Sequence, residues 1–291
     1  MPTASEDQDS IRQREYRTAF RELHEKGCFV IPNPWDAGSA RYLQHLGFPA
    51  LATTSSGAAF SLGRPDEDRA VPRDVMLAHI AEIAGAAGVP VNADFKSGYA
   101  REPAAVAANV RRCIKTGVAG LSIEDSTEDP EAPLFEFTLA VKRIRAAREA
   151  IDKSRTGVLL TARAECYLVG TPEPLAEAIR RLQAYSEAGA DVLYAPGPRT
   201  KEDIRAIVEA VHPKPVNALM IAGTGLKVSD FAEIGVRRIS VGSALARCAW
   251  GGFLRAAREI ATQGTFDAFN DAPAAAELNE FFRKDANSDI L

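Results

Sequence analysis

The chain has 291 residues, of which 46% are hydrophobic and 25% are charged, and its formal net charge is −4 at pH 7. This composition is ordinary for a globular protein, and the length suits one large α/β domain with a sizeable core. The slight negative charge argues against a nucleic-acid partner, which would favour a basic face. No apolar run approaches the roughly 20 residues of a membrane-spanning helix. We therefore expect neither a nucleic-acid nor a membrane partner.

The first segment of the chain, residues 1–15, is polar and charged and lacks the apolar stretch of a secretory signal. We expect residues 1–10 to be disordered, because they are small, acidic and polar. The four cysteines are isolated and form no C-x-x-C pair. Isolated cysteines favour free thiols in a reducing compartment, which predicts a cytoplasmic protein.

A repeating order of helices and short apolar strands follows. A helix is predicted from Ile11 to Lys26, with Phe20 and Leu23 on its apolar face. Eight candidate strands come next: Cys28–Ile31, Ala50–Thr53, Val89–Ala93, Gly117–Ile123, Gly157–Thr161, Ala190–Ala195, Pro215–Leu219 and Arg238–Val241. Helical stretches separate them, and this order is typical of a (β/α)8 TIM barrel of the α/β class. A doubly wound sheet is the alternative, although no G-x-G-x-x-G follows the first strand.

Two of the intervening helices have clear boundaries, Pro103–Lys115 and Pro174–Glu187. Each starts at a proline and ends before a glycine, as helix termini favour. No Pro/Gly/Ser-rich linker divides the chain. We therefore predict one catalytic barrel domain over residues 11–255 and an additional C-terminal helical segment over residues 256–291.

Polar side chains stand where the predicted strands end. Asp94 follows the third strand, Glu124 the fourth and Arg163 the fifth. Active sites of this fold lie at the carboxyl ends of the strands. Carboxylates there suit Mg²⁺, which prefers oxygen ligands and keeps several waters, with Mn²⁺ as an alternative. The hydroxyls and N–H groups of Ser55–Gly57 suit a carboxylate or phosphonate.

Each of these residues also has a structural interpretation. Asp94 could cap a helix, Glu124 could serve as a cap or form a surface ion pair, and Arg163 could belong to a structural ion pair instead of gripping a substrate carboxylate. Trp35 is more often a packing residue than a substrate contact. The occurrence of such residues at several strand ends together favours a functional pocket.

Several segments resemble the isocitrate lyase/phosphoenolpyruvate mutase superfamily. They are N-P-W-D-A-G-S-A-R (33–41), T-T-S-S-G-A-A (53–59), G-R-P-D (63–66), N-A-D-F-x-x-G-Y (92–99), G-V-A-G-L-S-I-E-D-S (117–126), L-L-T-A-R (159–163), A-Y-S-E-A-G-A-D (184–191), P-V-N (215–217) and R-R-I-S-V-G (237–242). The resemblance implies a TIM barrel whose last helix is exchanged between subunits of a homo-oligomer, either a dimer or a tetramer. It also implies Mg²⁺ and small dicarboxylate or 2-oxo acid substrates, cleaved or rearranged through an enolate.

The resemblance assigns roles by position. Asp94 would be the principal metal ligand and Glu124 would hold metal-bound water. Asp66 would belong to a mobile gating loop, and Asp66, Glu124 and Arg163 form the expected catalytic set. The expected substrate-binding set is Trp35, Ser55, Ser56, Gly57, Ala58, Arg163 and Asn217.

Two departures from the family pattern matter. The segment Ser126–Leu134 lacks the catalytic Cys loop of the isocitrate and methylisocitrate lyases, and it lacks the Lys and Asn of the phosphonopyruvate enzymes. Lys96 stands where many members have a second acid. Its side chain could point to solvent, to Glu124 or to Asp125 and leave Mg²⁺ on Asp94, or its ammonium could modify the metal site by partly replacing the cation.

These observations predict an Mg²⁺-dependent lyase or decarboxylase. It would cleave a C–C bond of a small 2-oxo or 2-hydroxy dicarboxylic acid of the oxaloacetate or substituted-malate class, through a metal-stabilised enolate. One alternative is a P–C bond enzyme of the phosphonopyruvate hydrolase or phosphoenolpyruvate mutase type. Another is a non-catalytic member that binds a 2-oxo acid.

Overall fold

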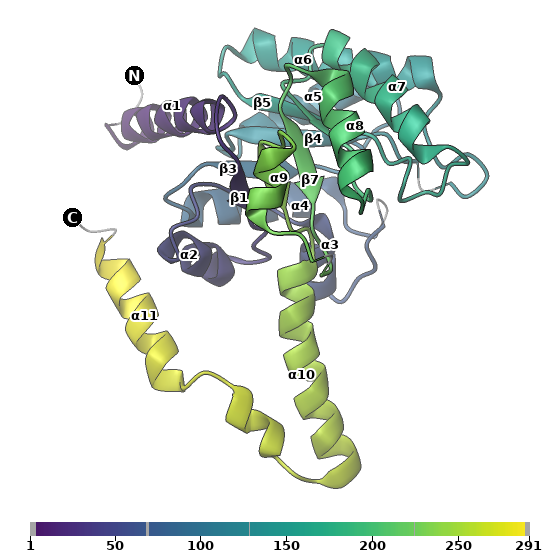
Figure 1. Ribbon diagram of the computed structural model, residues 1–291. Helices are drawn as coiled ribbons and strands as arrows, with labels where there is room; N and C mark the ends of the chain where they lie inside the picture. Colours follow the sequence, from purple (N-terminus) through teal and green to yellow (C-terminus); the bar gives the residue numbers. More distant parts are fainter. Residues whose placement is uncertain (1–3, 68–69, 128, 224, 289–291) are drawn as a thin grey trace. The chain divides into compact units, whose positions relative to one another are not determined.

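The computed structural model describes residues 4–67, 70–127, 129–223 and 225–288. The chain divides into two compact units, residues 1–244 and residues 245–291. In the first unit, an eight-stranded sheet carries helices on its outer side (Figure 1). Every strand pair is parallel, and apart from the β1–β8 pair, neighbours in the sheet are consecutive strands of the chain. The predicted α/β class and (β/α)8 barrel are confirmed.

All eight predicted strands are present, with boundaries that differ from the predicted ones by a few residues. They are β1 Phe29–Ile31, β2 Leu51–Ala52, β3 Val91–Asp94, β4 Gly120–Glu124, β5 Leu159–Arg163, β6 Val192–Tyr194, β7 Val216–Leu219 and β8 Arg238–Ser240. β1 pairs with β8. The backbone N–H of Ala52 in β2 donates to the carbonyl of Pro32, just after β1, at 3.0 Å, so a hydrogen bond also links the two ends of the sheet.

Nine helices of the first unit lie within the described residues. They are α1 Ala4–Leu23, α2 Ala37–His45, α3 Ser55–Ser61, α4 Arg73–Ala86, α5 Pro103–Ile114, α6 Phe137–Ser154, α7 Pro174–Glu187, α8 Lys201–Val211 and α9 Val228–Glu233. The predicted starts of α5 and α7 at proline are confirmed. On α5, the buried side chains Val106, Val110 and Cys113 recur at helical spacing, which explains why this segment forms a helix against the sheet.

The first helix differs from its prediction at both ends. Residues 4–10, expected to be disordered, are helical, and residues 1–3 lie outside the described part. Phe20 anchors the helix, because it is fully buried against Ile31 and Leu159. Once a packed turn exists, each added helical residue costs little, so the helix can extend in front of it. Its other end lies at Leu23, and the next residues form turns up to Gly27, whose φ is +75°.

The second unit contains α10 Ala244–Gln263 from its second residue onward, a short 3-10 helix Asp267–Asp271, and α11 Ala275–Ser288. The expected domain boundary at residue 255 falls within α10, whereas the compact barrel unit ends at residue 244. Additional C-terminal helices were predicted and are present. Within the described residues, no helix combines the length and the apolar character that a membrane span requires.

Candidate active site

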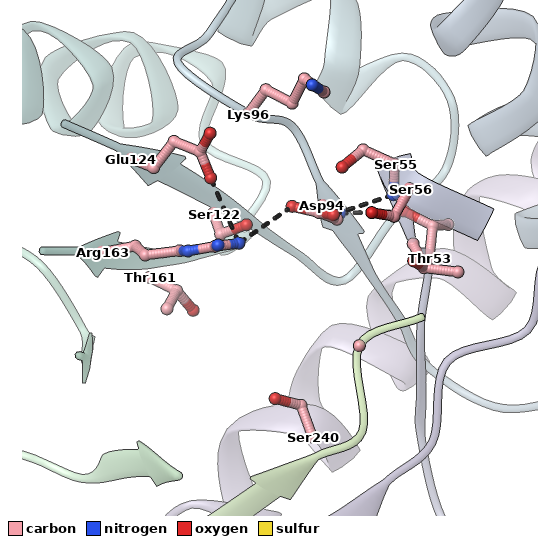
Figure 2. Close-up of polar contacts among 12 residues, drawn as sticks. Thr53, Ser55, Ser56, Asp94, Lys96, Ser122, Glu124, Thr161, Arg163 and Ser240 are labelled. Carbon is pink, nitrogen blue, oxygen red and sulfur yellow. Dashed lines mark hydrogen bonds and ion pairs between the residues drawn. The ribbon is translucent and has the colours of Figure 1, made fainter. Parts of the chain in front are cut away.

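The strand register brings the predicted strand-end residues together. Asp94 lies opposite Ser122 of β4, and Glu124 lies opposite Arg163 of β5. Side chains alternate along a strand, so Asp94, Glu124 and Arg163 all point into the mouth of the barrel. Figure 2 shows the guanidinium of Arg163 between the two carboxylates.

Arg163 is the electrostatic centre of this group. Its Nη1 lies 3.2 Å from Oε2 of Glu124 and 3.7 Å from Oδ1 of Asp94. Its Nε donates to Oε1 of Glu165, and its Nη2 donates to Oε2 of the same residue at 3.2 Å. Burial alone would lower the pKa of the guanidinium, but Glu165 and Glu124 raise that pKa well above its ordinary value. Arg163 therefore stays cationic and balances three surrounding carboxylates.

The Asp94 carboxylate has one satisfied and one unsatisfied oxygen. Its Oδ2 accepts from the backbone N–H of Ser55, in the first turn of α3, at 2.9 Å. Its Oδ1 is buried and has no hydrogen-bond partner, although Arg163 lies 3.7 Å away. Asp94 does not cap the helix after its own strand, because Glu102 is the N-cap of α5. A buried oxygen without a hydrogen bond suits a cation ligand.

A cavity of about 610 Å³ opens at this end of the barrel. Its size is ordinary for a small-molecule site. Seven of the predicted site residues line it: Ser55, Ser56, Asp66, Asp94, Lys96, Glu124 and Arg163. Ser55 and Ser56 lie in the first turn of α3. Thr54, the N-cap of this helix, fixes that turn by accepting from the N–H of Gly57.

The remaining predicted substrate-binding residues do not line the cavity. The N–H groups of Gly57 and Ala58 donate to the side chain and carbonyl of Thr54 in the first turn of α3. Asn217 is buried in the barrel interior, where it donates to Ser240 at 2.9 Å and accepts from Arg238 at 2.7 Å. Trp35 is half-buried beside the start of α2, and its backbone N–H donates to the hydroxyl of Ser39.

Several residues to which the sequence assigned no role also line the cavity. Glu165, which pairs with Arg163, stands two residues beyond it, so strand alternation could have indicated this residue. Tyr194 ends β6, and the Arg163 guanidinium lies 5.2 Å from the centroid of its ring. Burial raises the pKa of Tyr194 to about 12, so its hydroxyl keeps its proton at neutral pH. Apolar Leu168 and Ile221 come from loops, for which sequence periodicity gives no signal.

Lys96 has a partner that neither sequence interpretation anticipated. Its Nζ lies 3.0 Å from Oδ1 of Asp66. Figure 2 shows its side chain directed away from Glu124 and Arg163. The ammonium therefore lies beside the Asp66 carboxylate at the α3 side of the cavity, rather than between Asp94 and Glu124.

The fold and the cavity define a class of protein: a TIM-barrel enzyme with a carboxylate-rich pocket at the carboxyl ends of its strands. The phosphoenolpyruvate phosphomutase family model matches residues 20–261. The chain belongs to this family, within the isocitrate lyase/phosphoenolpyruvate mutase superfamily of carbon–carbon lyases and mutases. The predicted superfamily membership is confirmed.

Three relatives illustrate the similarity. A solved structure from Burkholderia cenocepacia J2315, provisionally assigned as a lyase/mutase, is 46% identical with a TM-score of 0.89, and the match covers 94% of this chain and 97% of that one. The 2,3-dimethylmalate lyase of Eubacterium barkeri is 30% identical over 73% of each chain. The oxaloacetate decarboxylase of Pseudomonas putida GB-1 is 29% identical over 84% of this chain and 82% of its own.

Proposed function

We propose that the protein is a divalent-metal-assisted lyase or decarboxylase that cleaves a C–C bond of a small 2-oxo or 2-hydroxy dicarboxylic acid. The observation that carries this proposal is the convergence of Asp94, Glu124 and Arg163 in one cavity, with the buried Oδ1 of Asp94 lacking a hydrogen bond. The names of two relatives, a dimethylmalate lyase and an oxaloacetate decarboxylase, support this substrate class.

The charges around the cavity support a metal. Among the described residues that line it, five are carboxylates, namely Asp66, Asp94, Glu124, Asp129 and Glu165, and two are cations, Lys96 and Arg163. An anionic substrate entering such a pocket needs additional positive charge. Within the described residues, no group of three or more His, Cys, Asp or Glu is arranged to hold a metal. Mg²⁺ or Mn²⁺ fits nonetheless, because such ions bind through one or two carboxylates and complete their shell with water and substrate.

Asp94 would hold this ion directly, and Glu124 would hold one of its waters. When bound, the ion would supply positive charge where the enolate develops. The chain's own residues would provide the rest. Arg163 orients the carboxylates of the site through its contacts to Glu124 and Glu165. The protonated hydroxyl of Tyr194 can donate a hydrogen bond into the cavity.

Part of the cavity lining is apolar. Leu168, Val169, Leu219 and Ile221 line it, and the side chains of Leu168 and Ile221 are 50% and 37% exposed. Exposed apolar side chains gathered at a charged pocket suit a substrate with an alkyl substituent. This apolar lining favours a substituted malate over the smaller oxaloacetate within the proposed class.

Turnover assays with Mg²⁺ test the proposal. Purified protein is given oxaloacetate and 2-alkylmalates, and the 2-oxo acid product is measured. We expect Asp94→Asn to lower turnover on the order of 100-fold, because it removes a charge at the reacting centre, and to weaken Mg²⁺ binding measured by calorimetry. Asp74→Asn, an exposed aspartate on α4, is the matched control and should change neither.

Full turnover in Asp94→Asn would contradict the proposed role of the metal. Phosphate release from phosphonopyruvate, measured in parallel, would instead indicate P–C bond chemistry. Binding of 2-oxo acids without any product would indicate a non-catalytic member of the family.

A further inference from the structure

The Asp66 carboxylate is held at both of its oxygens by residues of the cavity. Lys96 Nζ lies 3.0 Å from Oδ1, and the hydroxyl of Ser56 donates to Oδ2. The two donors come from separate elements, because Ser56 belongs to α3 and Lys96 to the turn after β3. A cation and a hydroxyl that each bind one oxygen form a two-pronged carboxylate site.

The partners differ in burial. The Lys96 side chain is 5% exposed, whereas the Asp66 side chain is 37% exposed. The ammonium therefore belongs to the cavity wall, and the carboxylate reaches it from the solvent side, from the segment between α3 and α4. A buried ammonium needs an anionic partner to offset its desolvation. Any carboxylate can fill this role, so another one could replace that of Asp66.

The backbone fixes Lys96 in this position. Its φ is +48°, in the left-handed region that disfavours side chains other than glycine and asparagine. Its carbonyl accepts from the N–H of Glu124 at 3.0 Å, which ties the turn to the end of β4. A lysine held in a strained conformation beside the catalytic strand ends points to a functional requirement.

The other cation of the cavity already has several partners. Arg163 contacts Asp94, Glu124 and Glu165. A substrate carboxylate that approached Arg163 would have to compete with three anions that belong to the barrel strands and their immediate continuation. At Lys96 it would compete with the Asp66 carboxylate, which is 37% exposed and comes from a connecting segment.

We propose that Lys96 and Ser56 form the binding site for the second carboxylate of the substrate, and that Asp66 occupies this site in the free protein as an internal stand-in. A dicarboxylate would displace Asp66 and keep the ammonium paired, so that Lys96 sets the specificity for diacids. This inference rests on the proposed function only for the class of ligand, because it concerns binding and not bond cleavage.

A matched pair of 2-hydroxy acids tests the inference. Malate and lactate share the 2-hydroxy acid group and differ in the second carboxylate. Calorimetry in the presence of Mg²⁺ should show that the wild-type protein binds malate at least on the order of tenfold more tightly than lactate. Lys96→Met should abolish this preference and leave lactate binding unchanged. Asp66→Asn should tighten malate binding several-fold, because it weakens the internal competitor.

Two further variants separate binding from folding. Lys96→Arg keeps a cation and should retain part of the preference for malate, whereas Lys115→Met removes an exposed lysine after α5 and should retain all of it. A Lys96→Met protein that melts like the wild type and still prefers malate would overturn the inference, and so would a wild-type protein without any preference. Both readouts are binding constants, so a failure to detect C–C cleavage would overturn the proposed function alone.

Discussion

At the residue scale, a buried acid behind the cavity supports the position of Glu165. Asp125 is 2% exposed, and its Oδ1 accepts from the N–H of Glu165 at 2.8 Å. Its Oδ2 accepts from Arg181 at 3.0 Å and from the hydroxyl of Tyr185 at 2.6 Å. Burial and the Asp125 charge raise the pKa of Tyr185, which keeps this hydroxyl a donor. Asp125 therefore links α7 to the residue that pairs with Arg163.

We predict that Asp125→Ala lowers the free energy of unfolding by about 3–5 kcal/mol, because it leaves the buried Arg181 guanidinium without one of its anions. Urea denaturation measures this change. Asp152→Ala is the control, since its ion pair with Arg148 is 64% exposed on the acid's side and should contribute only about 0–1 kcal/mol. Equal losses in the two variants would show that the Asp125 network does not stabilise the barrel.

The residues of the site differ in how well the sequence could indicate them. Asp94, Glu124 and Arg163 were predictable, because parallel strands in register must bring their ends together. The partner of Lys96 was not predictable, because Asp66 belongs to a connecting segment, and the path of such a segment cannot be inferred from hydrophobic periodicity. Asn217 was assigned to the substrate on position alone, and its amide instead bonds within the barrel.

At the element scale, a histidine in the turn directly after α1 links this helix to the starts of β1 and β8, because His24 contacts the Phe29 ring and the Arg238 guanidinium. The Nδ1 of His24 lies 2.7 Å from the carbonyl of Phe20, which can only accept, so Nδ1 carries the proton. Nε2 then accepts from Arg238, 3.4 Å away. Burial, together with the Arg238 charge, lowers the pKa of His24 to about 3.

A pH dependence of stability follows. The unfolded chain protonates His24 near its ordinary pKa of 6.5, whereas the folded protein does not until about 3. The contribution of neutral His24 to the free energy of unfolding is therefore complete above pH 6.5 and is lost as the pH falls from there toward 3. At pH 4.5 this loss is roughly 2–3 kcal/mol. We expect His24→Gln to flatten this part of the stability profile measured by urea denaturation. His45→Gln, on the exposed end of α2, should leave the profile as steep as in the wild type.

The barrel elements were largely predictable because the strands are buried on both faces and therefore read as short apolar runs between helices. The ends of the strands were less predictable. β5 extends through Ala162 and Arg163, beyond the apolar run, because its hydrogen bonds to β4 continue to the pairing of Glu124 with Arg163. The backbone ladder, and not hydrophobicity, sets where that strand ends.

At the scale of the whole molecule, the second unit exposes many large apolar side chains to solvent. They are Trp250, Phe253, Leu254, Ile260, Phe266, Phe269, Leu278 and Phe282, exposed between 36% and 60%. Large exposed apolar side chains gathered in one short segment are typical of an interaction site. Since they lie in residues 245–291, we infer that this segment would join the subunits of the homo-oligomer expected from the sequence.

We predict that the wild-type protein sediments as a dimer or tetramer of its 31.3 kDa chain. The double variant Phe253→Ser, Phe266→Ser should sediment as a smaller species, because each substitution removes a side chain that is 60% exposed in the single chain and would be covered in the assembly. Leu46→Ser, a matched loss of a 56% exposed apolar side chain in the barrel unit, should keep the wild-type mass. Sedimentation equilibrium measures all three. A monomeric wild type at micromolar concentration would refute the prediction, and an unchanged mass in the double variant would place the interface elsewhere in the chain.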